Sequence, residues 1–171
     1  SSKINAELFV QLRNNIYRQI PDGYEGIFLD GYADNGYSRN AWDSNGSAVQ
    51  NNTLDGGLNF GYAGYFQSIR ACNQVIKKAD NYPEIPVNDR EKYKAEARVM
   101  RAWLYGIASL YFGDIALSTD VSNDFPDGLP RNPASEVRTW VLKELDEAIA
   151  ILPQTNDKGY FNKAMATAIK A

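Results

Sequence analysis

Residues 95–117 read AEARVMRAWLYGIASLYFGDIAL, and this stretch decides the fold class. Its apolar side chains recur at steps of three and four residues, which is the period of one face of an α-helix. Gly113 is the residue type that most often ends a helix in a left-handed conformation. The stretch carries arginines and several aromatic rings but no group suited to catalysis, so we interpret this helix as scaffold.

The composition narrows the classes of function. A chain of 171 residues with 44% hydrophobic content is long enough to bury a core. The net charge of -3, with 18 Lys and Arg spread along the chain, argues against a nucleic-acid partner. No run approaches the about 18 apolar residues of a membrane-spanning helix. The first residues, SSKINAELF, do not have the pattern of a signal peptide.

The sequence contains no histidine and one cysteine. Histidine is the usual base of Ser-His-Asp and Cys-His sites and a common ligand of zinc, iron and copper. We therefore expect no such catalytic site, no metal and no cofactor, which leaves carboxylate, tyrosine or lysine chemistry for any enzyme. Cys72 falls within a helical apolar pattern and is predicted to be a buried core thiol.

Hydrophobic periodicity predicts an all-α chain of five helices that pack as pairs of the kind found in solenoids. The helices are expected over residues 4–20, 58–79, 88–112, 133–152 and 162–171. The strand-like run VRTWVL lies between helical flanks and is predicted to be helical. The apolar stripe of the first helix is formed by Ile4, Leu8, Leu12, Ile16 and Ile20.

Two helix starts have recognisable capping patterns. Asn88 is expected to cap the third helix, with Glu91 completing a capping box. Asn132 is expected to cap the fourth helix, with Pro133 as its first helical residue. The fifth helix is predicted to begin near Asn162 and is still helical in pattern at Ala171, so we expect the domain to continue beyond this sequence.

Arg98 and Arg101 lie three residues apart on one face of the third helix. Arginines in this setting commonly pack their aliphatic stems on a neighbouring ring and pair their guanidinium groups with carboxylates. Asp114 and Glu96 are the nearby candidates for this pairing. We interpret both arginines as structural.

The long segment 21–56 has no sustained period and contains six glycines together with Asn, Asp and aromatic residues. A loop of this length is either functional or disordered, and its aromatic content argues for function. Sugar rings stack their C–H faces on Trp or Tyr, and their hydroxyl groups pair with Asn and Asp. The predicted ligand-binding residues are Trp42, Tyr37, Tyr32, Asn40 and Asp43. The alternative is that these rings only hold the loop against the helices.

Four segments together resemble the SusD/RagB family of outer-membrane nutrient-binding lipoproteins. The opening stretch is similar to the family pattern E-A-R-x-x-R-A-x-x-Y followed by Y-F-G-D-x-P-L. YFQSIRACNQVI, residues 65–76, places Asn73 at the family asparagine. LPRNPASEVRTWVLKELDEAIAILP, residues 129–153, and residues 159–171 match two later segments. Two positions differ from the family pattern: Ala116 stands where a proline is usual, and Glu144 stands where an aspartate is usual. Over residues 1–57 the resemblance is loose.

The resemblance implies a SusD-like scaffold of tetratricopeptide-like helix pairs with long irregular loops. It implies binding of oligosaccharide, or in some members peptide, above a SusC-like TonB-dependent transporter on the cell surface of the outer membrane. Attachment to the membrane would be through a lipid anchor upstream of this chain. Because family members are longer, we expect residues 1–171 to be the N-terminal part of a single helical domain, truncated at its C-terminus.

We therefore predict a non-catalytic protein that binds oligosaccharide nutrients for uptake, similar to the starch-binding members of polysaccharide-utilisation systems. One alternative is a peptide-binding or purely protein-interaction scaffold. Another is a carboxylate glycosidase that uses Asp30 with Asp34 or Asp43 as acid and base, which would require these groups to face each other across a cleft.

Overall fold

The computed structural model describes residues 2–20, 30, 32–33, 36, 46–53, 55, 61–120 and 129–171. The chain forms two compact units, Ser1–Tyr17 with Tyr62–Ala171, and Arg18–Gly61. The helices of the first unit are α1 (Ser2–Ile16), α4 (Tyr62–Lys78), α5 (Val87–Phe112), α6 (Ala134–Ile151) and α7 (Lys163–Lys170). The short 3-10 helices η1 (Tyr17–Gln19) and η2 (Ala79–Asn81) follow α1 and α4.

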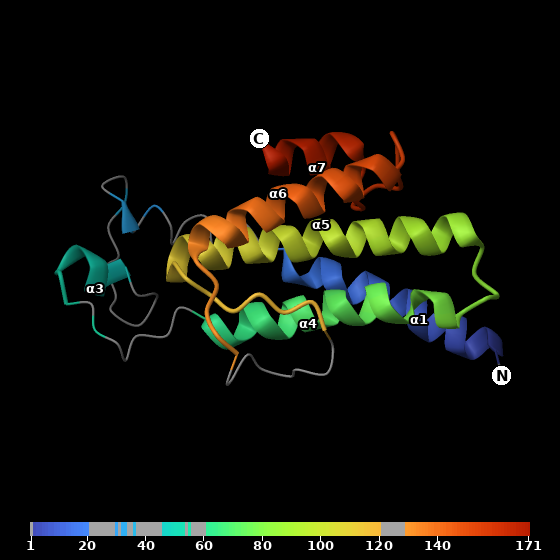
Figure 1. The fold of residues 1–171 in the computed structure, drawn as a ribbon, viewed down its shortest axis with the longest axis horizontal. Helices are drawn as coiled ribbons and strands as arrows, with labels where there is room; N and C mark the ends of the chain where they lie inside the picture. The colour runs from blue at the N-terminus through green and yellow to red at the C-terminus, as the bar shows by residue number, and fades with distance from the viewer. Residues whose placement is uncertain are drawn as a thin grey trace. The chain divides into compact units, whose positions relative to one another are not determined.

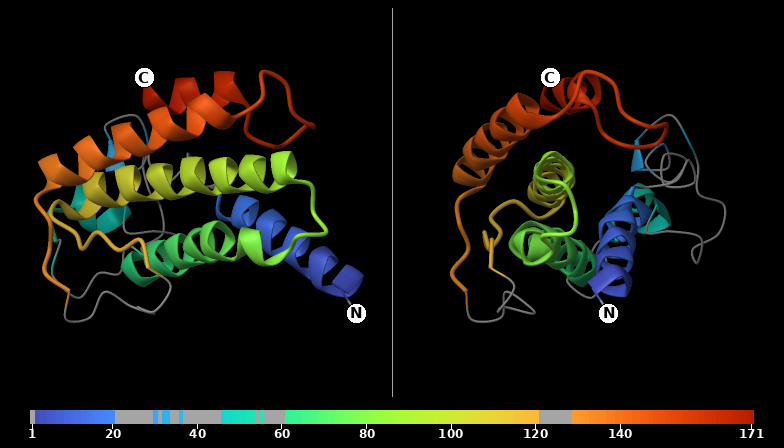
Figure 2. Two further views of the ribbon diagram at one scale, coloured as in Figure 1. Left: turned by 45° about the vertical axis from the view of Figure 1, so that its right-hand side comes forward. Right: turned by 90° about the vertical axis from the view of Figure 1, so that its right-hand side faces the viewer.

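Helix α5 is the centre of the first unit. It lies between α4 and α6, and α7 runs along α6 (Figure 1). Helix α1 packs beside α4 and also contacts α5 (Figure 2). The described ranges contain no strand, only an isolated bridge between Ile115 and Asn132. The all-α prediction is confirmed, and the run VRTWVL lies within α6.

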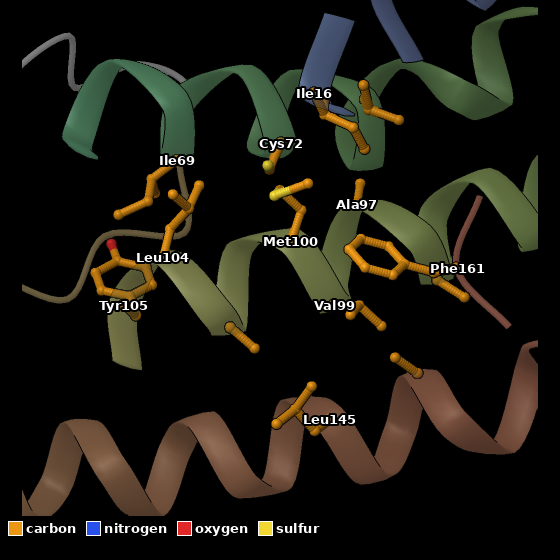
Figure 3. Close-up of a cluster of buried hydrophobic side chains, with 14 of the residues drawn as sticks. Ile16, Ile69, Cys72, Ala97, Val99, Met100, Leu104, Tyr105, Leu145 and Phe161 are labelled. Carbon is orange, nitrogen blue, oxygen red and sulfur yellow. The ribbon is translucent and has the colours of Figure 1, made fainter. Parts of the chain in front are cut away.

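The core is built on both sides of α5. Met100 of α5 points toward Cys72 of α4, and Leu145 of α6 points toward α5 from the other side (Figure 3). Small side chains on α5 let the neighbouring helices approach closely, because an alanine adds little bulk at a contact. The buried alanines of α5 are Ala95, Ala97, Ala102 and Ala108.

None of the helices within the described ranges combines the length and the apolar character required to cross a lipid bilayer.

The predicted face of α1 was wrong in part. Ile16 is buried as expected, but Leu8 is 55% exposed while Phe9 and Arg13 are buried. The Phe9 ring stacks on Tyr82, with ring centroids 4.6 Å apart. The buried face of α1 therefore includes an arginine, whereas a pattern based on apolar residues alone places arginine on the surface.

The predicted capping box of α5 was also wrong. The helix begins at Val87, and Pro86 before it is the N-cap, with φ -51° and ψ 140°. The carbonyl of Pro86 accepts the first helical hydrogen bonds, from the N–H groups of Asp89 and Arg90. Asn88 is therefore the second residue of the helix and does not occupy the N-cap position.

Helix α6 is capped from a distant residue and not by Asn132, as was predicted. Its N-cap position is Pro133, which has no side-chain acceptor. The carboxylate of Asp114 accepts from the Ala134 N–H at 2.9 Å and takes over the capping role. Asn132 instead accepts from the Leu117 N–H at 3.0 Å, which fixes the bridge between these two stretches.

Two other helix ends agree with the predictions. Gly113 follows the last residue of α5 with φ +69°, a conformation that costs glycine little. Asn162 caps α7, where its side-chain oxygen accepts from the Met165 N–H at 2.9 Å.

Cys72 provides a test of the core. The thiol is fully buried, as predicted, and this burial raises its pKa to about 12. An unfolded thiol has a pKa of about 8.5. Because the folded state keeps the proton, stability should be unaffected below about pH 8.5 and should fall as the pH rises from there toward the folded pKa.

We expect a thiol reagent to reach Cys72 at pH 8 only in molecules that have unfolded. The labelling rate, followed by mass spectrometry, should rise with added urea in step with the unfolded fraction. Rapid labelling in buffer that is insensitive to urea would contradict the position of Cys72 in the core.

Candidate functional site

The predicted binding residues belong to the second unit, Arg18–Gly61. Tyr32 is described and its side chain is partly buried. Trp42, Tyr37, Asn40 and Asp43 lie outside the described residues, so their roles stay predictions.

The described part of this segment is held by a short helix, α3 (Gly46–Gln50). The Gln50 side-chain amide donates to the carbonyl of Gly36 at 3.0 Å. After α3 the chain turns through Asn52, whose φ of 54° is a left-handed conformation that asparagine tolerates. The hydrogen bond from Gln50 joins the last residue of α3 to Gly36, the described residues on either side of four of the five predicted binding residues.

Both ends of the segment lead directly into packed helical structure. At the far end, Gly61 turns with φ +76° and Tyr62 begins α4. The Tyr62 ring packs against Phe66 and Phe112, with centroids 4.8 and 5.0 Å away. At the near end, Tyr17 packs edge-on against Tyr160, with centroids 5.0 Å apart. Fixed ends reduce the conformational entropy that ligand binding would otherwise remove.

A buried ion pair anchors α1, the helix that leads into the segment. Arg13 donates from Nε and Nη2 to the two carboxylate oxygens of Glu96, at 2.5 and 2.6 Å. Its guanidinium carbon also lies 3.7 Å from the Tyr160 ring centroid and 4.6 Å from that of Tyr93. Burial alone would lower the pKa of Arg13, but the hydrogen bonds and charge of Glu96 outweigh it and raise the pKa. The Arg13 guanidinium is therefore charged, and its two hydrogen bonds make the contact with Glu96 bidentate.

The same pair is joined to the connection between α6 and α7. The Asn156 amide donates to Glu96 at 2.9 Å and to the carbonyl of Phe161 at 2.8 Å. The Tyr17 hydroxyl accepts from the Phe161 N–H at 3.2 Å. Burial, and then the charge of Glu96, raise the pKa of Tyr17, so the phenol stays protonated. This network links α1 to residues far along the chain.

A second buried network joins α4, α5 and α6. Arg101 of α5 donates to the Asn73 side-chain oxygen at 2.7 Å and to the Glu144 carboxylate. All three side chains are buried. Since removing any one of them leaves a buried polar group without its partner, the network fixes the relative register of the three helices.

Asn73 and Tyr105 also fix the stretch that follows α5. The Asn73 amide donates to the carbonyls of Ser118 and Asp120 at 3.2 and 3.3 Å. The Tyr105 hydroxyl donates to the Ser118 carbonyl at 2.7 Å and accepts from the Ser118 N–H at 2.8 Å. Burial raises the pKa of Tyr105 to about 12, which keeps the phenol protonated as a donor.

The predicted partners of the α5 arginines were wrong. Arg98 donates to Glu147 at 2.6 Å, and Arg101 donates to Glu144. Glu96 faces α1 and is occupied by an arginine of that helix, while Asp114 caps α6. The structural role predicted for both arginines agrees with these contacts.

The described residues offer little for catalysis. The buried carboxylates among them are Glu96 and Glu144, and each is paired with an arginine. Asp30, one member of the possible glycosidase pair, is exposed, whereas Asp34 and Asp43 lie outside the described residues. Within the described ranges no group of carboxylates and cysteine is arranged to hold a metal ion.

Comparison with known proteins identifies the family. The family described as "Starch-binding associating with outer membrane", a SusD-like family, matches residues 2–171, and the chain belongs to it. A SusD-like protein of Formosa agariphila is 33% identical over 109 residues, which is 63% of this chain and 21% of the relative. A SusD-like protein of Bacteroides ovatus is 28% identical over 109 residues, 62% of this chain and 20% of the relative. The matched segment is therefore about a fifth of each relative.

Solved structures confirm the fold of helix pairs. A SusD-like protein from Bacteroides fragilis superposes with a TM-score of 0.83 at 20% identity, over 96% of this chain and 33% of that chain. A structure described as a laminarin-binding SusD-like protein superposes with a TM-score of 0.77 at 22% identity, over 97% and 38%. At these identities the likeness establishes the fold.

Some members of the two networks were not identified from the sequence. Asn156 lies in a polar connection, where nothing in the sequence marks it as a partner of Glu96. Trp140 lies in an α6 pattern that looks like ordinary core, yet the guanidinium carbon of Arg101 is 5.3 Å from its ring centroid. The family pattern itself marks Arg101, although it does not say which carboxylate neutralises it.

The second network provides a stability test. We expect Arg101→Met to lower the free energy of unfolding by about 3 kcal/mol, because the buried Glu144 loses its close partner and keeps only Arg98, whose Nε lies 3.9 Å away. Arg98→Met is the matched control. Its close pair with Glu147 is partly exposed and its contact with Glu144 is long, so this substitution should cost less than about 1 kcal/mol. Urea unfolding of both variants measures the difference. Equal effects of the two substitutions would contradict the role of the buried network.

Proposed function

We propose that this chain binds oligosaccharide nutrients without catalysis, through the segment Arg18–Gly61 carried on the helical unit. The observation that carries the proposal is the match of residues 2–171 to a family described as starch-binding. Its support from the residues is the combination of rings and amides in the segment, together with the hydrogen bond from Gln50 to Gly36 within it. The name of the laminarin-binding structural relative points to the same class of ligand.

The physical mechanism is capture by stacking and hydrogen bonding. An aromatic contact contributes roughly 1 kcal/mol beyond the burial of apolar area. A hydroxyl hydrogen bond contributes about 0.5–1.5 kcal/mol net. A few such contacts give modest affinity, which suits a protein that must release its ligand for uptake.

We further propose a location and a partner for the whole protein. It would be held on the outer face of the outer membrane by a lipid anchor and would deliver ligand to a SusC-like TonB-dependent transporter. The family description, which includes association with the outer membrane, supports this location. A peptide ligand, or a purely protein-interaction role, is the second candidate, since a helical scaffold can also present a surface to a protein.

Binding without hydrolysis is supported by the way the buried acids are used. Glu96 and Glu144 each neutralise a buried arginine, so both of these buried acids already have a structural partner. Incubating the protein with maltoheptaose or laminarihexaose and measuring new reducing ends distinguishes the two functions. Release of sugar at a rate proportional to protein concentration would favour the glycosidase alternative.

We expect Trp42→Ala to weaken binding of maltoheptaose or laminarihexaose by about tenfold, because the variant loses one stacking contact and its buried apolar area. Isothermal titration calorimetry measures the affinity, and the melting temperature should stay near that of the parent. Trp103→Phe on α5 is the matched control and should leave the affinity unchanged. An unchanged isotherm for Trp42→Ala would remove this residue from the site.

A further inference from the structure

The helical unit has a surface hollow that the proposed segment does not include. It lies beside the first half of α6 and has a volume of about 330 Å³. The residues that line it are Ser135, Glu136, Thr139, Trp140 and Lys143. Its lining combines one large aromatic ring with two hydroxyl groups and two opposite charges.

The ring in this hollow is held rigidly from the inside of the protein. Tyr105 packs against Trp140 in an edge-on arrangement, with ring centroids 5.2 Å apart and ring planes at 78°. The guanidinium carbon of Arg101 lies 5.3 Å from the Trp140 ring centroid, and Arg101 is itself fixed by Asn73 and Glu144. A ligand that stacks on this indole therefore meets a ring whose conformation is already set, so little entropy is lost.

Polar groups around the ring are available to a ligand. Within the described part of the chain, the indole N–H of Trp140 and the hydroxyl of Ser135 make no side-chain hydrogen bond. The Thr139 hydroxyl donates to the Ser135 carbonyl at 2.9 Å, which leaves its oxygen free to accept. The hollow thus offers donors and an acceptor next to an apolar face, as a pyranose ring requires.

We propose that this Trp140 hollow is a second saccharide-binding subsite, which takes one or two pyranose units of a neutral glucan. The proposal rests on the glycan-binding function of the family and deepens it. All five lining residues belong to α6, so the hollow is shallow and open on its outer side, and it can contact one face of a short piece of glucan.

The charges around the hollow favour a neutral sugar. Glu136 and Lys143 have opposite charges, so the hollow as a whole does not select an anionic glycan. A protein partner would need a contiguous surface of roughly 800 Å². Trp140 is the one apolar side chain among the five residues that line the hollow, which is less than such an interface requires.

The test follows the three tryptophan indole N–H signals in ¹⁵N-labelled protein, assigned with Trp42→Phe, Trp103→Phe and Trp140→Phe. Maltoheptaose and laminarihexaose are titrated separately. We expect the Trp140 signal to shift in a saturable way with a Kd of about 1 mM, typical of a few weak contacts. The Trp103 signal is the internal control and should stay in place.

The outcomes separate this subsite from the proposed segment. A shift of Trp42 without a shift of Trp140 overturns the subsite and leaves the proposed function standing. A shift of Trp140 alone supports the subsite and removes Trp42 from the primary site. Two stationary signals with both glucans overturn the subsite and contradict glucan binding as a whole.

A variant that fills the hollow provides the second measurement. Thr139→Arg places a long side chain over the indole at an exposed helical position, so the melting temperature should change little. We expect the Trp140 shift with maltoheptaose and laminarihexaose to be lost. Arg138→Ala, exposed on α6 and outside the hollow, is the matched control. A Trp140 shift of equal size in Thr139→Arg and in the control would overturn the proposal.

Discussion

Two charged side chains on the central helix α5 constrain how α1, α4 and α6 pack against it. Glu96 and Arg101 are both buried on α5, and a buried charge costs several kcal/mol unless it is paired and hydrogen bonded. Arg13 of α1 neutralises the first, and Glu144 of α6 neutralises the second. A shift of either helix by one turn would separate its pair, so these contacts exclude most other arrangements of α1 and α6 on α5.

Aromatic contacts in the helical unit fix the two ends of the segment Arg18–Gly61. Tyr17 and Tyr62 border the segment between them, and each packs into an aromatic cluster of the helical unit. The segment can therefore vary in sequence while its ends stay fixed, which is the usual division between a rigid scaffold and functional loops. The fixed position of Trp140 on α6 has the same origin, since it contacts an arginine that the second network holds in place.

This arrangement gives the family pattern a physical meaning. Glu96, Arg98, Arg101 and Tyr105 are the polar residues of the pattern in α5, and each contacts another helix or the stretch that follows α5. A pattern made of interior contacts preserves the fold while other positions change, which agrees with TM-scores of 0.77 and 0.83 at 22% and 20% identity. It also explains why family membership indicates the scaffold more directly than the particular sugar.

The sequence by itself determined the five helices of the first unit, the buried thiol of Cys72, the end of α5 at Gly113 and the cap of α7 at Asn162, because each depends on neighbours within a few residues. It also indicated the chemistry of the segment from residue types alone. It did not predict the short helix α3, which lies in the segment without a sustained period. Only the tertiary structure decided that α1 buries Arg13, that Asp114 caps α6 and that Trp140 borders a hollow. These features depend on contacts between residues far apart in the chain, 83 positions in the case of Arg13 and Glu96, and no local periodicity records such a distance.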